Sequence, residues 1–189
     1  MVRSAPSRVR SRRVAVVELA VGFSLVGSLL AVAVPTFVRE VHASRLVEPA
    51  DGLKRLGASA VAYGQAHRDL SPAPGAQATA GAAFFPASAA LTPSQPPRGK
   101  CEVDPPGTWD GPTWTALAFR PAPPDVPHCF AFAFDSAASP GLATFRAHAH
   151  ADLDGDGIPS TFEVTGRAVS GDPRGAVLDP GMFVESEAE

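Results

Sequence analysis

The stretch VAVVELAVGFSLVGSLLAVAVPTFV, residues 14–38, decides the fold of this 189-residue chain. It is a run of 25 residues with a single charge, Glu18. A helix of that length rises about 37 Å at 1.5 Å per residue, which is enough to cross the hydrocarbon core of a bilayer. The sequence therefore predicts a transmembrane helix over residues 14–38.

The residues before this stretch predict its orientation. The leader, residues 1–13, contains no acidic residue and five arginines: Arg3, Arg8, Arg10, Arg12 and Arg13. Positive charge next to a membrane helix stays on the cytoplasmic side. We therefore expect a basic cytoplasmic leader, a single pass through a membrane, and an extracytoplasmic domain after about residue 39.

The charge outside the leader narrows the classes of function. The net charge of the chain is −3, from 16 basic and 19 acidic residues. Without the five leader arginines, the chain has 11 basic and 19 acidic residues, which is a net charge of −8. An acidic domain argues against nucleic acid as a partner and is compatible with a bound cation. No nucleophile paired with a base and no glycine-rich phosphate loop stands out, so we expect no enzyme.

A cleaved secretory signal is the first alternative to a retained anchor, because a basic leader followed by an apolar run is also its signature. The apolar core of a signal peptide usually has 7–15 residues. The present run is longer and continues without a convincing small-residue cleavage site into an amphipathic segment. We therefore favour the retained anchor.

Residues 39–67 have the pattern of an amphipathic helix that continues the first one. Leu53, Leu56, Ala60 and Tyr63 recur at helical spacing and form one stripe, which needs a partner surface. Pro49 either bends this helix or begins its second part, since proline is accepted in a first turn. The helix is expected to end near His67.

The segment from residue 68 to residue 128 is rich in proline and small residues. Composition alone would suggest a disordered linker. Its aromatic residues instead predict an irregular but ordered loop region over a sheet; they are Phe84, Phe85, Trp109, Trp114 and Phe119.

Cys101 and Cys129 are the only cysteines. In an oxidising compartment such a pair is most simply a disulfide, although two buried thiols are the alternative. Closing this loop would stabilise the fold by roughly 3–4 kcal/mol in the chain-entropy model.

Alternating patterns in residues 129–189 predict strands. CFAFAF places Phe130, Phe132 and Phe134 on one face. ATFRAHAHA and STFEVTGRAV alternate in the same way, and a short strand is expected near residues 181–184, before an acidic tail. The predicted fold is α+β, with a three- or four-stranded antiparallel meander packed on the amphipathic half of the long helix.

The motif VAVVELAVGFSLVGSLLAVAVPTF resembles the N-terminal segment of type IV pilins and of the pseudopilins of type II secretion. Glu18 and the proline 17 residues later, Pro35, match the Glu and Pro of that family. FFPASAALTPSQPP, WDGPTW and DLDGDGIPSTFE also resemble segments of a pilin-like group. The resemblance implies a pilin-like fold, assembly with other pilin or pseudopilin subunits through the N-terminal helix, and processing by prepilin peptidase.

The expected processing point departs from the family pattern. Arg13 stands where the peptidase requires glycine, and Val14 stands where Phe or Met is usual. Two outcomes remain open: cleavage between Arg13 and Val14, or a leader that stays attached.

Glu18 has two interpretations. An ionisable group inside an apolar span is costly unless it is paired, so it could meet the N-terminal amine of a neighbouring subunit in a filament and set the register of assembly. Without cleavage there is no amine at Val14, and Glu18 would pair elsewhere or be protonated. Alternatively, it is tolerated near the cytoplasmic interface.

An acidic loop follows the second predicted strand. Asp152, Asp154 and Asp156, with Gly157 and Glu163, fit the calcium-loop pattern D-x-D-x-D-G-x5-E. The flanks alternate like strands, so calcium would bind in a hairpin loop through the three aspartates and the Ile158 carbonyl, with Glu163 less certain. The alternative is an Asp/Gly-rich turn.

Two histidines precede the acidic loop. His148 and His150 share a strand face and could ligate zinc, or could belong to a solvated face opposite Glu163.

Overall fold

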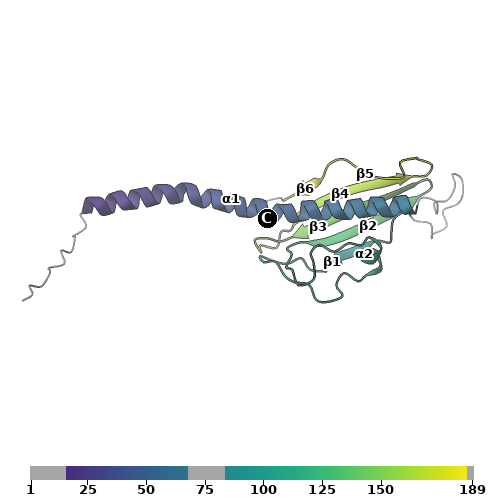
Figure 1. The fold of residues 1–189 in the computed structure, drawn as a ribbon, viewed down its shortest axis with the longest axis horizontal. Coiled ribbons are helices and arrows are strands. Elements are labelled where there is room, and N and C mark those ends of the chain that lie inside the picture. Colours follow the sequence, from purple (N-terminus) through teal and green to yellow (C-terminus); the bar gives the residue numbers. More distant parts are fainter. Residues whose placement is uncertain (1–15, 68–83, 187–189) are drawn as a thin grey trace, which may run out of the picture. The chain divides into compact units, whose positions relative to one another are not determined.

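The computed structural model describes residues 16–67 and 84–186, except for the side chains of residues 38–45. It contains one long helix, one short helix and six strands over the described residues (Figure 1). In chain order these are α1 (Val16–Ala66), β1 (Ala89–Thr92), α2 (Pro112–Ala116), β2 (Ala131–Ser139), β3 (Leu142–Ala151), β4 (Ser160–Val169), β5 (Ala176–Leu178) and β6 (Phe183–Glu185).

Helix α1 joins the two predicted helical segments into one element of 51 residues. It continues through Pro35 and Pro49, so no second helix begins at Pro49. It ends at Ala66, one residue before the predicted end. The described chain divides into two compact units between Val41 and His42, close to the predicted boundary after residue 38.

The sheet is antiparallel and larger than predicted. Its strand order is β1-β2-β3-β4-β5, and β6 also pairs with β4. The predicted three- or four-stranded meander corresponds to β2, β3, β4 and β6. Two strands were missed, β1 and β5, because they have only four and three residues and show no alternation of their own. The α+β class is confirmed.

The amphipathic half of α1 lies across one face of this sheet (Figure 1). Leu53, Leu56 and Ala60 have no exposed surface, as the stripe predicted. Tyr63 is only half-buried and stacks on His67, with ring centroids 3.9 Å apart.

Glycines allow the helix to approach the sheet closely. A Cβ added at Gly52 would lie 2.5 Å from the ring of Phe132, and one at Gly64 would lie 2.7 Å from the Cβ of Ala176. The phenylalanine faces of the strands are buried against this helix, as predicted; Phe130, Phe132 and Phe134 are completely buried.

Residues 84–128 are ordered, as their aromatic residues predicted, but they are not irregular throughout. They contain β1 at the sheet edge and the short helix α2, which begins with Pro112, a residue suited to a first turn. Trp109, Trp114 and Phe119 pack on one another beside Phe132. The rest of the predicted loop region, residues 68–83, lies outside the described residues.

Candidate functional site

The first candidate site is the N-terminal part of α1. Its segment Val16–Phe37 is 22 residues long, and its length and apolar composition are sufficient to cross a membrane. None of its most apolar window is buried within the chain. Exposed side chains along it include Phe23, Leu29 and Phe37, each at least 70% exposed. Such a surface is unfavourable in water and needs lipid or protein around it.

The predicted assembly residues lie in this segment. Glu18 occupies the first turn of α1, where a negative charge is favoured by the helix dipole. Pro35 lies in the last part of the span and has no N–H to donate. The hydroxyl of the next residue, Thr36, donates to the carbonyls of Val32 and Ala33, at 3.0 and 2.9 Å. The predicted processing residues, Arg13 and Val14, lie outside the described residues.

The second candidate site is the acidic loop between β3 and β4. One ligand oxygen from each of Asp152, Asp154 and Asp156 lies within 4.8 Å of the others. Asp152 is buried, and its carboxylate accepts the N–H groups of Gly155 and Gly157 at 2.8 and 3.1 Å. Both glycines have positive φ, at 83° and 94°, so the turn requires residues without a Cβ.

A strand-like segment holds this loop from one side. The N–H of Gly99 donates to the carbonyl of Asp152 at 2.8 Å, and the guanidinium of Arg98 lies 3.8 Å from its carboxylate. Cys101 follows two residues later and forms a disulfide with Cys129, as predicted. The acidic loop is therefore connected, through residues 98–101, to the start of β2.

Glu163, the fourth carboxylate of the predicted calcium loop, is not part of the group that the three aspartates form among the described residues. Glu163 lies on β4 opposite His148, and its carboxylate faces Arg146 at 3.2 Å and His148 at 3.5 Å. Ile158 lies in the loop, and its N–H donates to the carboxylate of Asp156 at 2.7 Å.

The two histidines of β3 share a face, as predicted. His148 lies between Glu163 and Asp135, whose carboxylate is 3.1 Å from its Nε2 atom. His150 contacts the hydroxyl of Thr161 at 3.0 Å. The pKa of His150 is lowered by burial and, to a lesser degree, by the neighbouring His148 ring. The two rings stack with centroids 5.8 Å apart.

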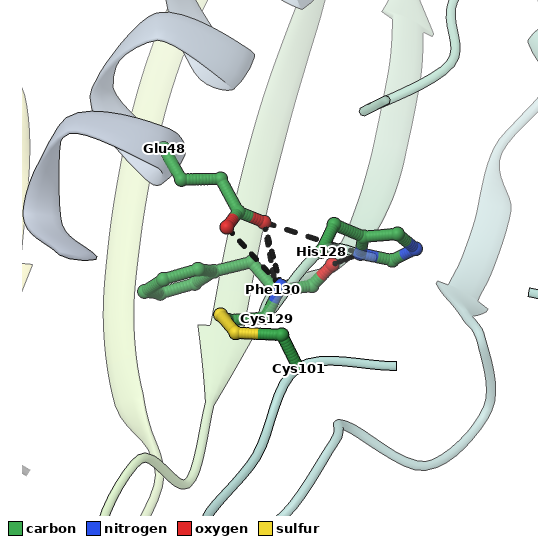
Figure 2. The surroundings of a disulfide bond; sticks show 5 residues. All are labelled: Glu48, Cys101, His128, Cys129 and Phe130. Carbon is green, nitrogen blue, oxygen red and sulfur yellow. Dashed lines mark hydrogen bonds and ion pairs between the residues drawn. A yellow bond between two sulfur atoms is a disulfide. The ribbon is translucent and has the colours of Figure 1, made fainter. Parts of the chain in front are cut away.

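A third group of charged residues was not predicted. Glu48 of α1 accepts the N–H groups of Cys129 and Phe130 at 2.9 and 3.1 Å, next to the disulfide (Figure 2). Burial raises the pKa of this carboxyl above its usual value of 4.5, and the two N–H donors and the nearby His128 partly oppose that rise. His128 itself is buried and contacts Asp104. We refer to Glu48, Asp104 and His128 as the charged cluster.

One weak signal of the charged cluster is present in the sequence: Glu48 lies next to Pro49, on the side of the helix that is otherwise apolar or small. Its partners are 81 and 82 residues away, and Asp104 and His128 are 24 residues apart in a proline-rich segment. Spacing in the sequence therefore could not connect them.

Comparisons with known proteins add no relative to this description. No family model matches the chain, and neither the curated proteins nor the solved structures contain a match.

Proposed function

We propose that this chain is a pilin-like structural subunit that is anchored in the inner membrane and assembles through α1 into a type IV pilus or a type II secretion filament. The observation that carries the proposal is the division of one helix into two surfaces. Val16–Phe37 is apolar, and none of its most apolar window is buried within the described chain. The part after Leu46 is packed on an antiparallel sheet.

These two surfaces suit a subunit that moves from a bilayer to a helical assembly. In the membrane, lipid covers the apolar span, and the basic leader keeps the N-terminus in the cytoplasm. In a filament, the same side chains would be covered by the helices of neighbouring subunits. The folded domain would remain outside the membrane in both states.

Glu18 would give this assembly its register. A carboxylate among apolar side chains is costly, and pairing with a cation of the neighbouring subunit reduces that cost. After cleavage at Arg13, the partner would be the free amine of Val14. With an attached leader, the leader arginines are the nearest cations in the sequence.

Substitution of Glu18 tests the proposal. Glu18→Ala should abolish incorporation into filaments, measured by shearing and pelleting of cell-surface material, while membrane insertion remains intact. Ser28→Ala is a matched control, since its hydroxyl donates only to the carbonyl of Ser24 in the same helix. Wild-type levels of assembly in Glu18→Ala would contradict the proposal.

A monomeric signal-anchored extracytoplasmic domain that binds calcium or a partner is the competing function, and a secreted binding module released by signal cleavage is the third. Single cysteines placed along Val16–Phe37 in a background lacking the native pair distinguish the first two. A regular ladder of cross-linked species supports a filament, and monomers alone support an anchor. N-terminal sequencing of the purified protein identifies the third, because its mature N-terminus would lie beyond Pro35.

We further propose that the acidic loop binds calcium in this subunit. Three carboxylates within 4.8 Å of one another repel unless a cation neutralises them, and oxygen ligands suit calcium. The proposed ligands are Asp152, Asp154 and Asp156, with the Ile158 carbonyl. Glu163 is engaged by Arg146 and His148 instead.

Thermal unfolding tests the calcium proposal. Calcium should raise the melting temperature of the wild-type chain, and Asp154→Ala and Asp156→Ala should each remove that gain. Asp51→Ala, an exposed acid on α1, is the control and should keep it. A wild-type melting temperature that is the same in calcium and in chelator would assign the loop to an ordinary turn.

A further inference from the structure

A surface pocket of about 300 Å³ lies between two proline-rich loops of the domain. One loop, residues 103–109, comes before α2, and the other, residues 120–128, leads from α2 to β2. Four of the lining residues are prolines: Pro105, Pro106, Pro123 and Pro124. Because a proline ring fixes φ, these walls have little conformational freedom to lose when a ligand binds.

The two loops are joined at their base. The N–H of Glu102 donates to the carbonyl of His128, and the N–H of His128 donates to the carbonyl of Glu102, each at 3.0 Å. Cys101 and Cys129, the sequence neighbours of these two residues, form the disulfide. The pocket is therefore held open by a bridge and a covalent bond, and it is formed before any ligand arrives.

Asp104 offers this pocket an acceptor oxygen. Its Oδ2 atom accepts the indole N–H of Trp109 and lies 2.6 Å from Nε2 of His128. Among the described residues, no hydrogen bond or ion pair is made to Oδ1. No fully buried side-chain oxygen in the described part of the chain lacks a partner, so Oδ1 lies on the exposed 15% of this side chain. One oxygen thus positions the carboxylate, and the other is accessible to a donor.

The charges around the pocket favour a cation. Two carboxylates line it, those of Asp104 and Asp125, together with one guanidinium, that of Arg120. The guanidinium is paired at 3.3 Å with Asp110, which is not a lining residue. Because the rest of the domain is also acidic, a positively charged ligand is attracted and an anion is repelled.

We propose that this pocket binds an alkylammonium ion, carried by a lysine side chain of a partner protein or by a free amine. The ammonium group donates to Oδ1 of Asp104. Its methylene chain lies against the prolines and against Val103 and Val126, lining residues that are 48% and 45% exposed. Only one oxygen of Asp104 is accessible, so a compact ammonium suits the pocket better than a guanidinium, which pairs with two oxygens at once. The inference does not rest on the filament or calcium proposals.

The indole resonances of the intact chain measure this binding by NMR. The chain has two tryptophans. The indole N–H of Trp109 donates to Asp104 and reports the pocket, whereas that of Trp114 donates to Thr92 and serves as an internal reference. Trp109→Phe assigns the two resonances directly, and Trp114→Phe assigns them by elimination.

The titration uses the 15N-labelled full chain in an uncharged detergent. Nα-acetyl-lysinamide represents the side chain of a partner, and 1,5-diaminopentane represents a free amine. We expect a saturable shift of the Trp109 resonance with at least one of them, and the tighter of the two identifies the source of the ammonium group. Nα-acetyl-norleucinamide, which has no ammonium group, should give no saturable shift. An equal response to the norleucine compound, or no response to either amine, would overturn the proposal.

Two variants test the position of the ammonium group. Asp104→Asn keeps an acceptor for Trp109 but removes the charge, and it should weaken binding of the tighter amine by at least about tenfold. Val126→Lys leaves Asp104 and its contacts in place and supplies an ammonium group from the chain itself, so it should also prevent binding. Asp51→Asn, an exposed acid on α1, is the matched control and should bind as the wild-type chain does. Wild-type affinity in Asp104→Asn or in Val126→Lys would overturn the proposal.

Discussion

The two halves of α1 share one backbone conformation but have opposite surroundings. Val16–Phe37 leaves its apolar side chains exposed, whereas the half after Leu46 buries a stripe of leucine, alanine and glycine against phenylalanine rings. The first half is apolar on all sides, and the second is apolar on one side only. The pattern of apolar residues, and not helix formation itself, therefore determines whether a helical segment needs lipid and neighbouring chains or its own sheet.

Truncating one leucine in each half should give the largest contrast. Leu56→Ala leaves a cavity beneath the helix and should lower the free energy of unfolding of the domain by about 2–5 kcal/mol. Leu29→Ala removes a side chain that is 70% exposed and should leave it unchanged within about 0.5 kcal/mol. Denaturant unfolding in micelles, followed by tryptophan fluorescence, measures both. Equal losses would mean that the first half also packs on the domain.

Glycine substitutions sharpen the contrast within the packed half. Gly52→Ala places a methyl group against the ring of Phe132, which is fully buried, and should destabilise the domain by about 1–3 kcal/mol. Gly57→Ala meets the mobile end of Leu178, which is 40% exposed and can move aside. That variant should gain up to about 1 kcal/mol from helix propensity. The same denaturation assay measures both variants. A change in the free energy of unfolding that has the same sign in both would contradict the packing described.

Removal of Glu48 tests the polar contact of the packed half. Glu48→Ala leaves the N–H groups of Cys129 and Phe130 without their acceptor, which should cost about 1–3 kcal/mol. Glu48→Gln keeps an acceptor oxygen and should cost less, although it loses the charge beside His128. Denaturant unfolding of the two variants at neutral pH measures both losses of stability. A larger loss of stability in Glu48→Gln than in Glu48→Ala would contradict the role of Glu48 as an acceptor.

The pH dependence of Glu48 should be the smallest effect. Burial raises the pKa of this carboxyl, so the folded state holds its proton more firmly than the unfolded chain does. Its contribution to stability is therefore fully present below the ordinary value of 4.5 and is lost as the pH rises through the folded-state pKa. Relative to Glu48→Gln, the wild-type chain should lose stability from pH 4 upward. Denaturant unfolding of the two chains across this pH range measures the difference.

The features that could be predicted from the sequence are those in which apolar residues recur at a regular spacing within one helix or strand. The apolar run, the stripe from Leu53 to Ala60 and the alternating phenylalanines of β2 each lie within one element, and each was found where the period placed it. The disulfide was predicted because no other cysteine exists. By contrast, β1 and β5 are too short to show a regular spacing. They form because they pair with β2 and β4.

The candidate sites divide in the same way. The acidic loop is contiguous in sequence, so its three aspartates could be found by motif. Glu163 satisfied the motif but lies opposite His148, because the strand register and not the motif decides its neighbours. The charged cluster joins residues that are distant in sequence and carry no pattern, and only the fold brings them together.

The fit between Gly52 and Phe132 has a mechanical consequence. The ring of a fully buried side chain occupies the place where a Cβ would be, so α1 cannot slide along its axis without forcing a side chain into that ring. A force that pulls on the helix along its axis would therefore act on β2 as a shear force. That strand lies between β1 and β3, and its ladder with β3 runs from Ala131 to Ser139. Many hydrogen bonds of this ladder share such a force at once, so the domain resists unfolding when the helix is pulled along its axis.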